Sequence, residues 1–175
     1  MDFPAEFSSS KIVLKKADPV FASAMWALIS QNKEYFIYID SIQSLDNMEK
    51  VRDFLSEMQQ KSKKQEYGYF LFVLEKLVGY VGIKIRPGEH VAELSYYLDK
   101  AETGKGYAST AVMLLEEKFF SEGGHRCEIF CNENNLKSRH LAERLNYRLD
   151  GIMREYEYRH HRYEGVSVYS KIKGE

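Results

Sequence analysis

Long apolar runs are missing from this sequence. No stretch reaches the roughly 18 apolar residues that a membrane-spanning helix needs, and residues 1–10 lack the basic and then apolar pattern of a secretion signal. An excess of charge of one sign is missing too, since 25 Lys and Arg stand against 26 Asp and Glu. Broad electrostatic attraction to nucleic acid or to an anionic membrane is therefore not expected. We expect a protein of the cytoplasm that binds neither.

Cysteine is scarce, with Cys127 and Cys131 as the two in the sequence. Four residues apart on one predicted strand, they share a face and lie about 13 Å apart, which is too far for a disulfide. His125 and the two thiols are candidate metal ligands, but their spacing along a strand makes it hard for all three to bind one ion. We therefore predict two buried, reduced thiols and no metal site.

The sequence has enough apolar material for a packed core. Its 175 residues are 44% hydrophobic and 14% aromatic, which favours a folded globule over a disordered chain. Repeats, linkers and low-complexity segments do not interrupt it. We predict a single domain over residues 1–175, with its patterned core at roughly 11–173.

The most informative stretch is a strand, a glycine turn and a helix in succession. Leu94–Leu98 is a short apolar and aromatic run typical of a buried strand, and from Ala108 onward the apolar residues take helical spacing. Between them lies the turn Thr103–Ser109, in which Gly104 and Gly106 let the backbone come close to a ligand. The positive end of the following helix favours an anion, most naturally a phosphate. Glycine turns that bind nothing have the same pattern, so both interpretations stay open.

A second segment, Asn132–Arg139, follows an apolar strand and leads into a short helix. The two segments in this order resemble the GCN5-related N-acetyltransferase (GNAT) superfamily, most closely its RimJ/RimL-like branch. The phosphate-loop pattern of the superfamily is Gln/Arg-x-x-Gly-x-Gly/Ala. It falls on Thr103, Gly106 and Ala108, with threonine in place of the usual Gln or Arg.

The second pattern of the superfamily is Asn-x-x-Ser/Ala, then a helix, then a Gly-Phe pair. Asn135 and Ser138 match its first part, and Asn146-Tyr147 stands where the pair is expected. Asparagine tolerates the left-handed conformation that glycine would adopt there, so the change is mild.

The resemblance implies an α/β fold, the GNAT fold, with a mixed, mostly antiparallel sheet of about seven strands, about four flanking helices and one splayed parallel pair. Asp18 and Ser44 are the predicted N-caps of the first two helices, the glycine turn opens the third, and the fourth is residues 135–145. The expected strands are residues 11–15, 67–74, 77–85, 93–98, 126–131, 147–158 and 166–172.

For the co-substrate, the resemblance implies acetyl-CoA and no metal. Its pantetheine arm would lie between the splayed strands and pair with the backbone near Tyr96, Tyr97 and Leu98. Asn135 would reach the pantetheine side. The pyrophosphate would sit on the glycine turn, made of Thr103, Gly104, Lys105, Gly106, Tyr107, Ala108 and Ser109, with Lys105 able to pair with a phosphate oxygen.

Acetyl transfer to an amine needs a neutral amine, a donor for the developing oxyanion and a proton for the leaving thiolate. The oxyanion donor is expected to be a backbone N–H near Tyr97 or Leu98. Many members supply the proton from a tyrosine seven residues after the Asn of the second pattern, but Ala142 stands there. Ser138 is then the candidate, because the RimL-like branch carries a serine near the sulfur. The alternative is a helix serine that bonds its own backbone.

Glu93 is the candidate general base, because strand alternation places it on one face with Ser95 and Tyr97. The alternative is a surface carboxylate. An α-amine, whose pKa is about 8, gives up its proton to such a base more readily than a lysine, whose pKa is about 10.4. This difference mildly favours protein N-termini or weakly basic amines.

The loop expected at residues 159–165 carries Arg159, Arg162 and Tyr163, which are candidates for contact with the acceptor or another subunit, so a homo-oligomer is possible. The histidines near element ends are predicted to have surface roles: His125, His140, His160 and His161.

Taken together, the sequence predicts an acetyl-CoA-dependent N-acetyltransferase that acts on a primary amine, with a protein N-terminal α-amine of the ribosomal-protein type as the first choice. A small-molecule amine and a non-catalytic acetyl-CoA sensor are the alternatives. A nicotinamide dinucleotide fingerprint is disfavoured, because Ser109 stands where a third glycine belongs and the turn follows hairpin-like strands.

Overall fold

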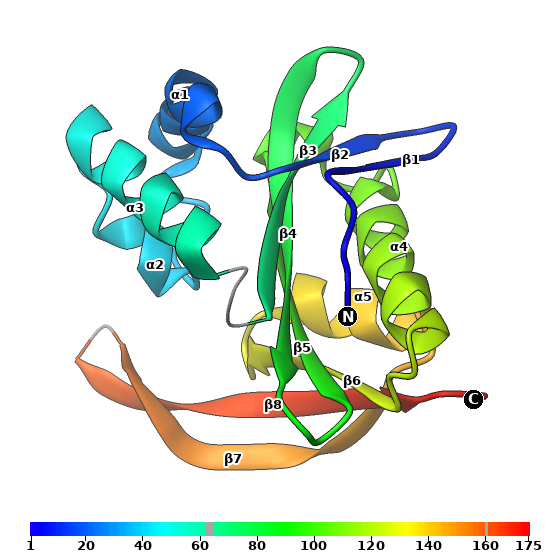
Figure 1. The fold of residues 1–175 in the computed structure, drawn as a ribbon. Helices are drawn as coiled ribbons and strands as arrows, with labels where there is room; N and C mark the ends of the chain where they lie inside the picture. Colours follow the sequence, from blue (N-terminus) through cyan, green and yellow to red (C-terminus); the bar gives the residue numbers. More distant parts are fainter. Residues whose placement is uncertain (62–64, 160) are drawn as a thin grey trace.

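The computed structural model describes residues 1–61, 65–159 and 161–175, and Figure 1 shows how its elements are arranged. Within these residues, eight strands form one sheet in the order β1-β2-β3-β4-β5-β6-β8-β7. The predicted surface position of His160 lies outside the described residues. In the part of the chain that is described, no helix is both long and apolar enough to cross a membrane.

The strands are β1 (Glu6–Ser8), β2 (Val13–Lys16), β3 (Glu66–Val73), β4 (Lys76–Arg86), β5 (Val91–Leu98), β6 (Arg126–Asn132), β7 (Arg148–Arg159) and β8 (Arg162–Ile172). The helices are α1 (Ala22–Asn32), α2 (Asp40–Gln43), α3 (Met48–Lys61), α4 (Tyr107–Ser121) and α5 (Leu136–Arg144), with short 3₁₀ turns η1 (Pro19–Phe21) and η3 (Lys100–Glu102). Between described neighbours the pairing is antiparallel except for β5 and β6, which confirms the predicted mixed sheet.

Helices cover both faces of the sheet (Figure 1). The helices α1, α2 and α3 pack on one face, and α4 and α5 pack on the other. The apolar stripe predicted for α4 is buried, at Ala111, Val112, Leu115 and Phe119. On the opposite face the core contains Met25, Leu28, Val51 and Leu55. Helical spacing in the sequence therefore identified the buried side of α4.

The parallel strands β5 and β6 pair at their beginnings and then part. Their register runs from Val91 opposite Arg126 to Glu93 opposite Glu128, and no later pair joins them among the described residues. Both strands continue, because β4 stays paired with β5 up to Leu98 and β8 stays paired with β6 up to Asn132. The predicted splayed pair is confirmed. We call the space between Leu94–Leu98 and Ile129–Asn132 the β5–β6 gap.

The left-handed conformation expected at Asn146 is confirmed, and Gly123 adopts it as well. Asn146 adopts a φ of 63°, the left-handed conformation expected where the resembling superfamily has glycine. Gly123 adopts a φ of 91° just after α4, and the N–H of Gly124 bonds the carbonyl of Phe119 at 2.9 Å. Glycine and asparagine reach this region with little strain, which is why they end these helices.

The two cysteines and three of the four histidines with a predicted surface position lie where the sequence predicted them. Cys127 and Cys131 are both buried and free of any disulfide. The side chains of His125, His140 and His161 are exposed.

The prediction that Ser44 caps the second helix is wrong. That helix, α3, begins at Met48, and the side chain of Asn47 accepts a hydrogen bond from the N–H of Lys50 at 2.9 Å. Ser44 instead ends the separate short helix α2. Both residues are good caps, and the sequence alone gave no means to see that α2 intervenes.

Two further differences concern strands. The strand β1 was not predicted, because its three residues are too short for an alternating pattern. It is held by pairing with β2 and by Phe7, whose ring meets Tyr69 edge-on at 5.3 Å.

The loop expected at residues 159–165 is also shorter than predicted. Residues Arg162 to Gly165 belong to β8, where Tyr163 pairs with Tyr158 and the rings lie 5.1 Å apart.

Candidate active site

The backbone on the β5 side of the gap alternates in direction. The N–H of Asp99 donates to the carbonyl of Val78 on the β4 side at 2.7 Å. In an antiparallel pair, residues that bond the neighbour alternate with residues that face away from it. Tyr97 therefore turns its backbone to β4, whereas Tyr96 and Leu98 present their N–H and C=O groups to the β5–β6 gap. An extended ligand could pair with these two residues as an added strand would.

The glycine turn beyond β5 is open and leads directly into α4. Gly104 and Gly106 have φ values of 81° and 82°, and a Cβ added at either would meet no described atom within 4 Å. Gly106 is the N-cap of α4 and provides no side-chain cap among the described residues. The N–H groups of the first helical turn are thus left for an anion, with the helix dipole in its favour.

The side chains around this turn are held by local contacts. The Thr103 hydroxyl donates to the carbonyl of Lys100 at 2.9 Å. The Lys105 ammonium lies 2.7 Å from a carboxylate oxygen of Glu102, and this hydrogen bond raises the pKa of Lys105. Glu102 also lies 3.6 Å from Lys76. If Lys105 pairs with a phosphate, it must leave Glu102, which is easy for an exposed ion pair.

On the other side of the gap, Asn135 caps α5. Its side-chain oxygen accepts a hydrogen bond from the N–H of Ser138 at 3.3 Å. The Ser138 hydroxyl lies 2.9 Å from the hydroxyl of Tyr96. Burial raises the pKa values of Tyr96 and of Cys131 on β6, so both groups keep their protons at physiological pH. The Tyr96–Ser138 contact joins β5 to α5 where the strands have parted.

The hydroxyl of Tyr96 is a candidate that the sequence reasoning missed, since it assigned only backbone contacts to this residue. Strand alternation places Tyr96 on the face opposite Glu93 and Tyr97, toward α5. That alternation was the available signal. The partner Ser138 is 42 residues away, so only the folded chain reveals the contact. Ala142, at the position where the superfamily resemblance led us to look for a tyrosine, is fully buried.

A cavity of about 220 Å³ lies on the α1–α3 face of the same strand. It is lined by Ser41, Phe54, Met58, Glu66, Tyr67, Gly68, Tyr80, Gly82, Ile83, Lys84, Glu93, Ser95 and Tyr97; we call it the β5 cavity. The prediction that Glu93, Ser95 and Tyr97 share a face is confirmed, because all three line it. Within the cavity, Glu66 lies 3.6 Å from the ammonium of Lys84. The strand β5 is therefore a common wall of the gap and the cavity.

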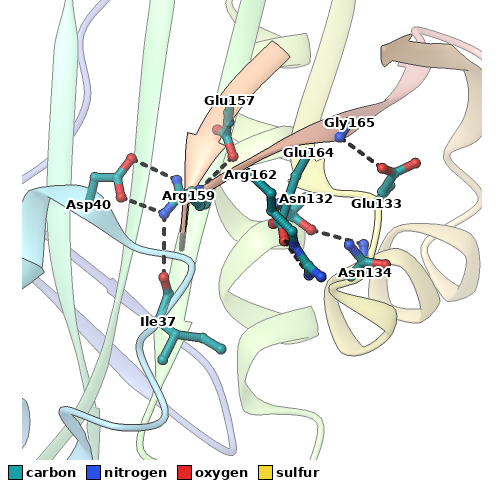
Figure 2. Close-up of polar contacts among 10 residues, drawn as sticks. All are labelled: Ile37, Asp40, Asn132, Glu133, Asn134, Glu157, Arg159, Arg162, Glu164 and Gly165. Carbon is teal, nitrogen blue, oxygen red and sulfur yellow. Dashed lines mark hydrogen bonds and ion pairs between the residues drawn. The ribbon is translucent and has the colours of Figure 1, made fainter. Parts of the chain in front are cut away.

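The segment that joins α1 to α2 is tied to the opposite half of the molecule. Figure 2 shows Arg159, near the end of the β7–β8 hairpin, bonded to both carboxylate oxygens of Asp40, to Glu157 and to the carbonyl of Ile37. One Arg159–Asp40 contact is 2.7 Å and the Glu157 contact is 2.8 Å. The sequence marked Arg159 as a candidate contact with an acceptor or subunit, and here it contacts this chain itself.

Replacing Arg159 by glutamine is expected to lower the free energy of unfolding by about 1–2 kcal/mol, because the side chain is largely buried and its charge-assisted bonds are lost. Urea denaturation measures this. Arg148→Gln is the matched control, since that guanidinium is 77% exposed where it pairs with Glu175. Equal losses in the two variants would contradict a stabilising role for the Arg159 contacts.

A second set of polar contacts in Figure 2 holds the loop between β6 and α5 in place. Asn132 donates to the buried carboxylate of Glu164 at 2.7 Å, and Arg162 bonds the other oxygen of Glu164 at 2.6 Å. The carboxylate of Glu133 accepts from the N–H of Gly165 at 2.8 Å. These bonds hold the start of α5, and with it Asn135, against β8. No group of three or more His, Cys, Asp or Glu side chains in the described ranges is placed to hold a metal ion.

Comparison with known proteins places these features in context. A sequence profile described as Acetyltransferase (GNAT) family matches residues 27–147. The Bacillus subtilis (strain 168) protein named Probable N-acetyltransferase YjcK is 32% identical over 136 residues, which is 73% of this chain and 75% of that protein. The ribosomal-protein-serine acetyltransferase of Escherichia coli (strain K12) is 28% identical over 106 residues, 59% of either chain.

Solved structures have the same fold. RimL, a ribosomal L7/L12 alpha-N-protein acetyltransferase in complex with coenzyme A, is similar with a TM-score of 0.89 and 25% identity over 97% of this chain and 96% of that one. The microcin C7 self immunity acetyltransferase MccE, in complex with acetyl-CoA and AMP, has a TM-score of 0.91 at 23% identity and covers 97% of both chains. At that identity the second likeness concerns the fold alone.

Proposed function

Because this chain belongs to the acetyltransferase (GNAT) family, we propose that it moves the acetyl group of acetyl-CoA to the α-amine at the N-terminus of a protein. The observation that carries the proposal is the double role of β5, whose backbone borders the β5–β6 gap while Glu93 lines the β5 cavity. The 28% identity to a ribosomal-protein-serine acetyltransferase supports a protein N-terminus as the acceptor.

The residues around the gap fit the donor. When bound, acetyl-CoA supplies a thioester that a neutral amine can attack directly. Gly104 and Gly106 leave an open turn at the N-terminus of α4, which suits a pyrophosphate. Tyr96 and Leu98 offer backbone groups to an extended arm, and the N–H of Leu98 is our candidate to bond the developing oxyanion.

Glu93 is the proposed general base on the acceptor side. Its carboxylate lines the β5 cavity, so an amine held there reaches it directly or through one water molecule. An α-amine loses its proton with a pKa of about 8, which a carboxylate relay can manage near neutrality. A lysine ammonium, with a pKa of about 10.4, would be neutral far less often. The chemistry therefore favours an N-terminus over a lysine side chain.

Ser138 is the proposed source of a hydrogen bond for the leaving thiolate, with Tyr96 as its partner. A thiol has a pKa of about 8.5 and leaves with little help. Ser138→Ala is therefore expected to lower kcat by less than about tenfold at pH 7, below the hundredfold or more of a full general acid. Steady-state kinetics with a saturating peptide acceptor measure this. A loss beyond about a hundredfold would contradict a merely assisting role.

The experiment that tests the function locates the transferred acetyl group. Thiol release is followed with acetyl-CoA and three acceptors: a lysine-free peptide with a free N-terminus, the same peptide blocked at its N-terminus and given one lysine, and a small polyamine. Mass spectrometry of the products should find the acetyl group on the α-amine. Transfer only to lysine or the polyamine would overturn the N-terminal assignment. Acetyl-CoA binding without any turnover would favour a sensor instead.

A further inference from the structure

One buried hydroxyl in the acceptor region has no partner. Tyr97 is 9% exposed, and among the described residues its hydroxyl makes no hydrogen bond. Leaving such a buried group unpaired destabilises the folded protein, and a phenylalanine would avoid this cost. Four other buried or half-buried tyrosine hydroxyls are bonded: Tyr67 to the carbonyl of Met1, Tyr69 to that of Pro4, Tyr147 to Glu116 and Tyr169 to Glu143.

The ring of Tyr97 is held firmly in position. It stacks on Tyr80 with centroids 5.2 Å apart and planes 16° apart, and it packs against Phe36 at 5.2 Å. Gly79, opposite Leu98 on β4, leaves room for the close backbone of Tyr97, since an added Cβ would lie 2.5 Å from its carbonyl oxygen. The hydroxyl oxygen itself is closed to solvent, so a shift of the residues around it must admit an acceptor group. Burial raises the pKa of Tyr97, so the hydroxyl keeps its proton and can donate.

Tyr97 lines the β5 cavity together with Glu93 and Ser95. The charged groups on the cavity wall are the carboxylates of Glu66 and Glu93 and the ammonium of Lys84, which pairs with Glu66. The carboxylate of Glu93 is then left to face an arriving ammonium group. The cavity therefore offers an acceptor one charged contact for its amine and one fixed hydroxyl nearby.

We infer that Tyr97 determines acceptor specificity, with its hydroxyl bonding a polar group that the acceptor carries on the residue bearing the reactive amine. The inference rests on the proposed function, because it takes the β5 cavity as the acceptor site. A site that pairs with a substrate hydroxyl discriminates strongly against an analogue without it, since the buried group is then left unpaired. Tyr97 is thus a specificity-determining residue and takes no part in proton transfer.

Two peptides identical except for serine or alanine at the first position provide the test. The wild-type protein is expected to prefer the serine peptide by about tenfold or more in kcat/KM. Tyr97→Phe should bring the ratio close to one by lowering kcat/KM for the serine peptide. Its thermal midpoint should stay equal or rise, because an unpaired buried hydroxyl has been removed.

Tyr67→Phe is the matched control, because this cavity-lining tyrosine already uses its hydroxyl on Met1 and should keep the serine preference. If the wild type acetylates both peptides and Tyr97→Phe leaves the ratio unchanged, the inference fails and the proposed function stands. If the wild type acetylates neither peptide, the proposed function fails, and the inference fails with it. A lowered midpoint in Tyr97→Phe would reveal a structural partner and also contradict the inference.

Discussion

Replacing Gly106 by alanine is expected to weaken acetyl-CoA binding at least about tenfold. The residue has a φ of 82°, where a side chain costs about 1–2 kcal/mol. The added methyl group also stands at the N-cap of α4, where a phosphate must approach the backbone N–H groups. Isothermal titration calorimetry with acetyl-CoA measures the affinity of the wild type and the variant.

Gly88→Ala is a closely matched control for this experiment. Gly88 has a φ of 79° and, like Gly106, an added Cβ there would meet no described atom within 4 Å. It lies in the turn between β4 and β5, so the whole length of β5 separates it from the glycine turn. Both variants should lose similar stability, but Gly88→Ala should bind acetyl-CoA like the wild type. Equal loss of affinity in both would mean that Gly106 acts only through folding.

Glu93→Gln is expected to lower kcat/KM for a peptide N-terminus about a hundredfold at pH 7, the lower end of what a general base contributes. The loss should shrink as the pH rises above about 8, because the free α-amine then becomes the main species and needs no base. A pH profile of initial rates for both proteins measures this. The amide keeps the size of the carboxylate, so binding should change little.

Glu66→Gln is the control, because this carboxylate lines the same cavity but pairs with Lys84. It should change kcat/KM by no more than a few fold. A Glu93→Gln variant with wild-type rates across the pH range would mean that another group takes the proton. A constant hundredfold loss at every pH would point to a role for Glu93 in positioning the acceptor.

The sequence predicted the elements whose signals are local. The glycine turn, the start of α4 and the alternation of Glu93, Ser95 and Tyr97 all follow from neighbouring residues, and each is present in the structure. The splayed strand pair was predicted from the family resemblance, and the register of β5 and β6 confirms the prediction. Local features of this kind can be predicted because the backbone geometry of a strand, turn or helix start allows few conformations for such short sequence patterns.

Contacts between distant residues could not be predicted in the same way. Arg159 and Asp40 are 119 positions apart, and neither stands in a pattern that points to the other. The Tyr96–Ser138 contact needs both the parting of β5 from β6 and the orientation of α5. The missed strand β1 is stabilised by its neighbour and by aromatic packing, and a three-residue segment carries no periodic signal of its own.

Amide hydrogen exchange, resolved by residue with and without acetyl-CoA, tests most directly the claim that the β5–β6 gap holds the donor. The amides of Tyr96 and Leu98 should exchange more slowly when acetyl-CoA is bound, as should those of the turn 104–109. The amides of Ser95 and Tyr97 should change little, because they already bond β4. Protection of Ser95 and Tyr97 in place of Tyr96 and Leu98, or no protection along β5, would contradict the account.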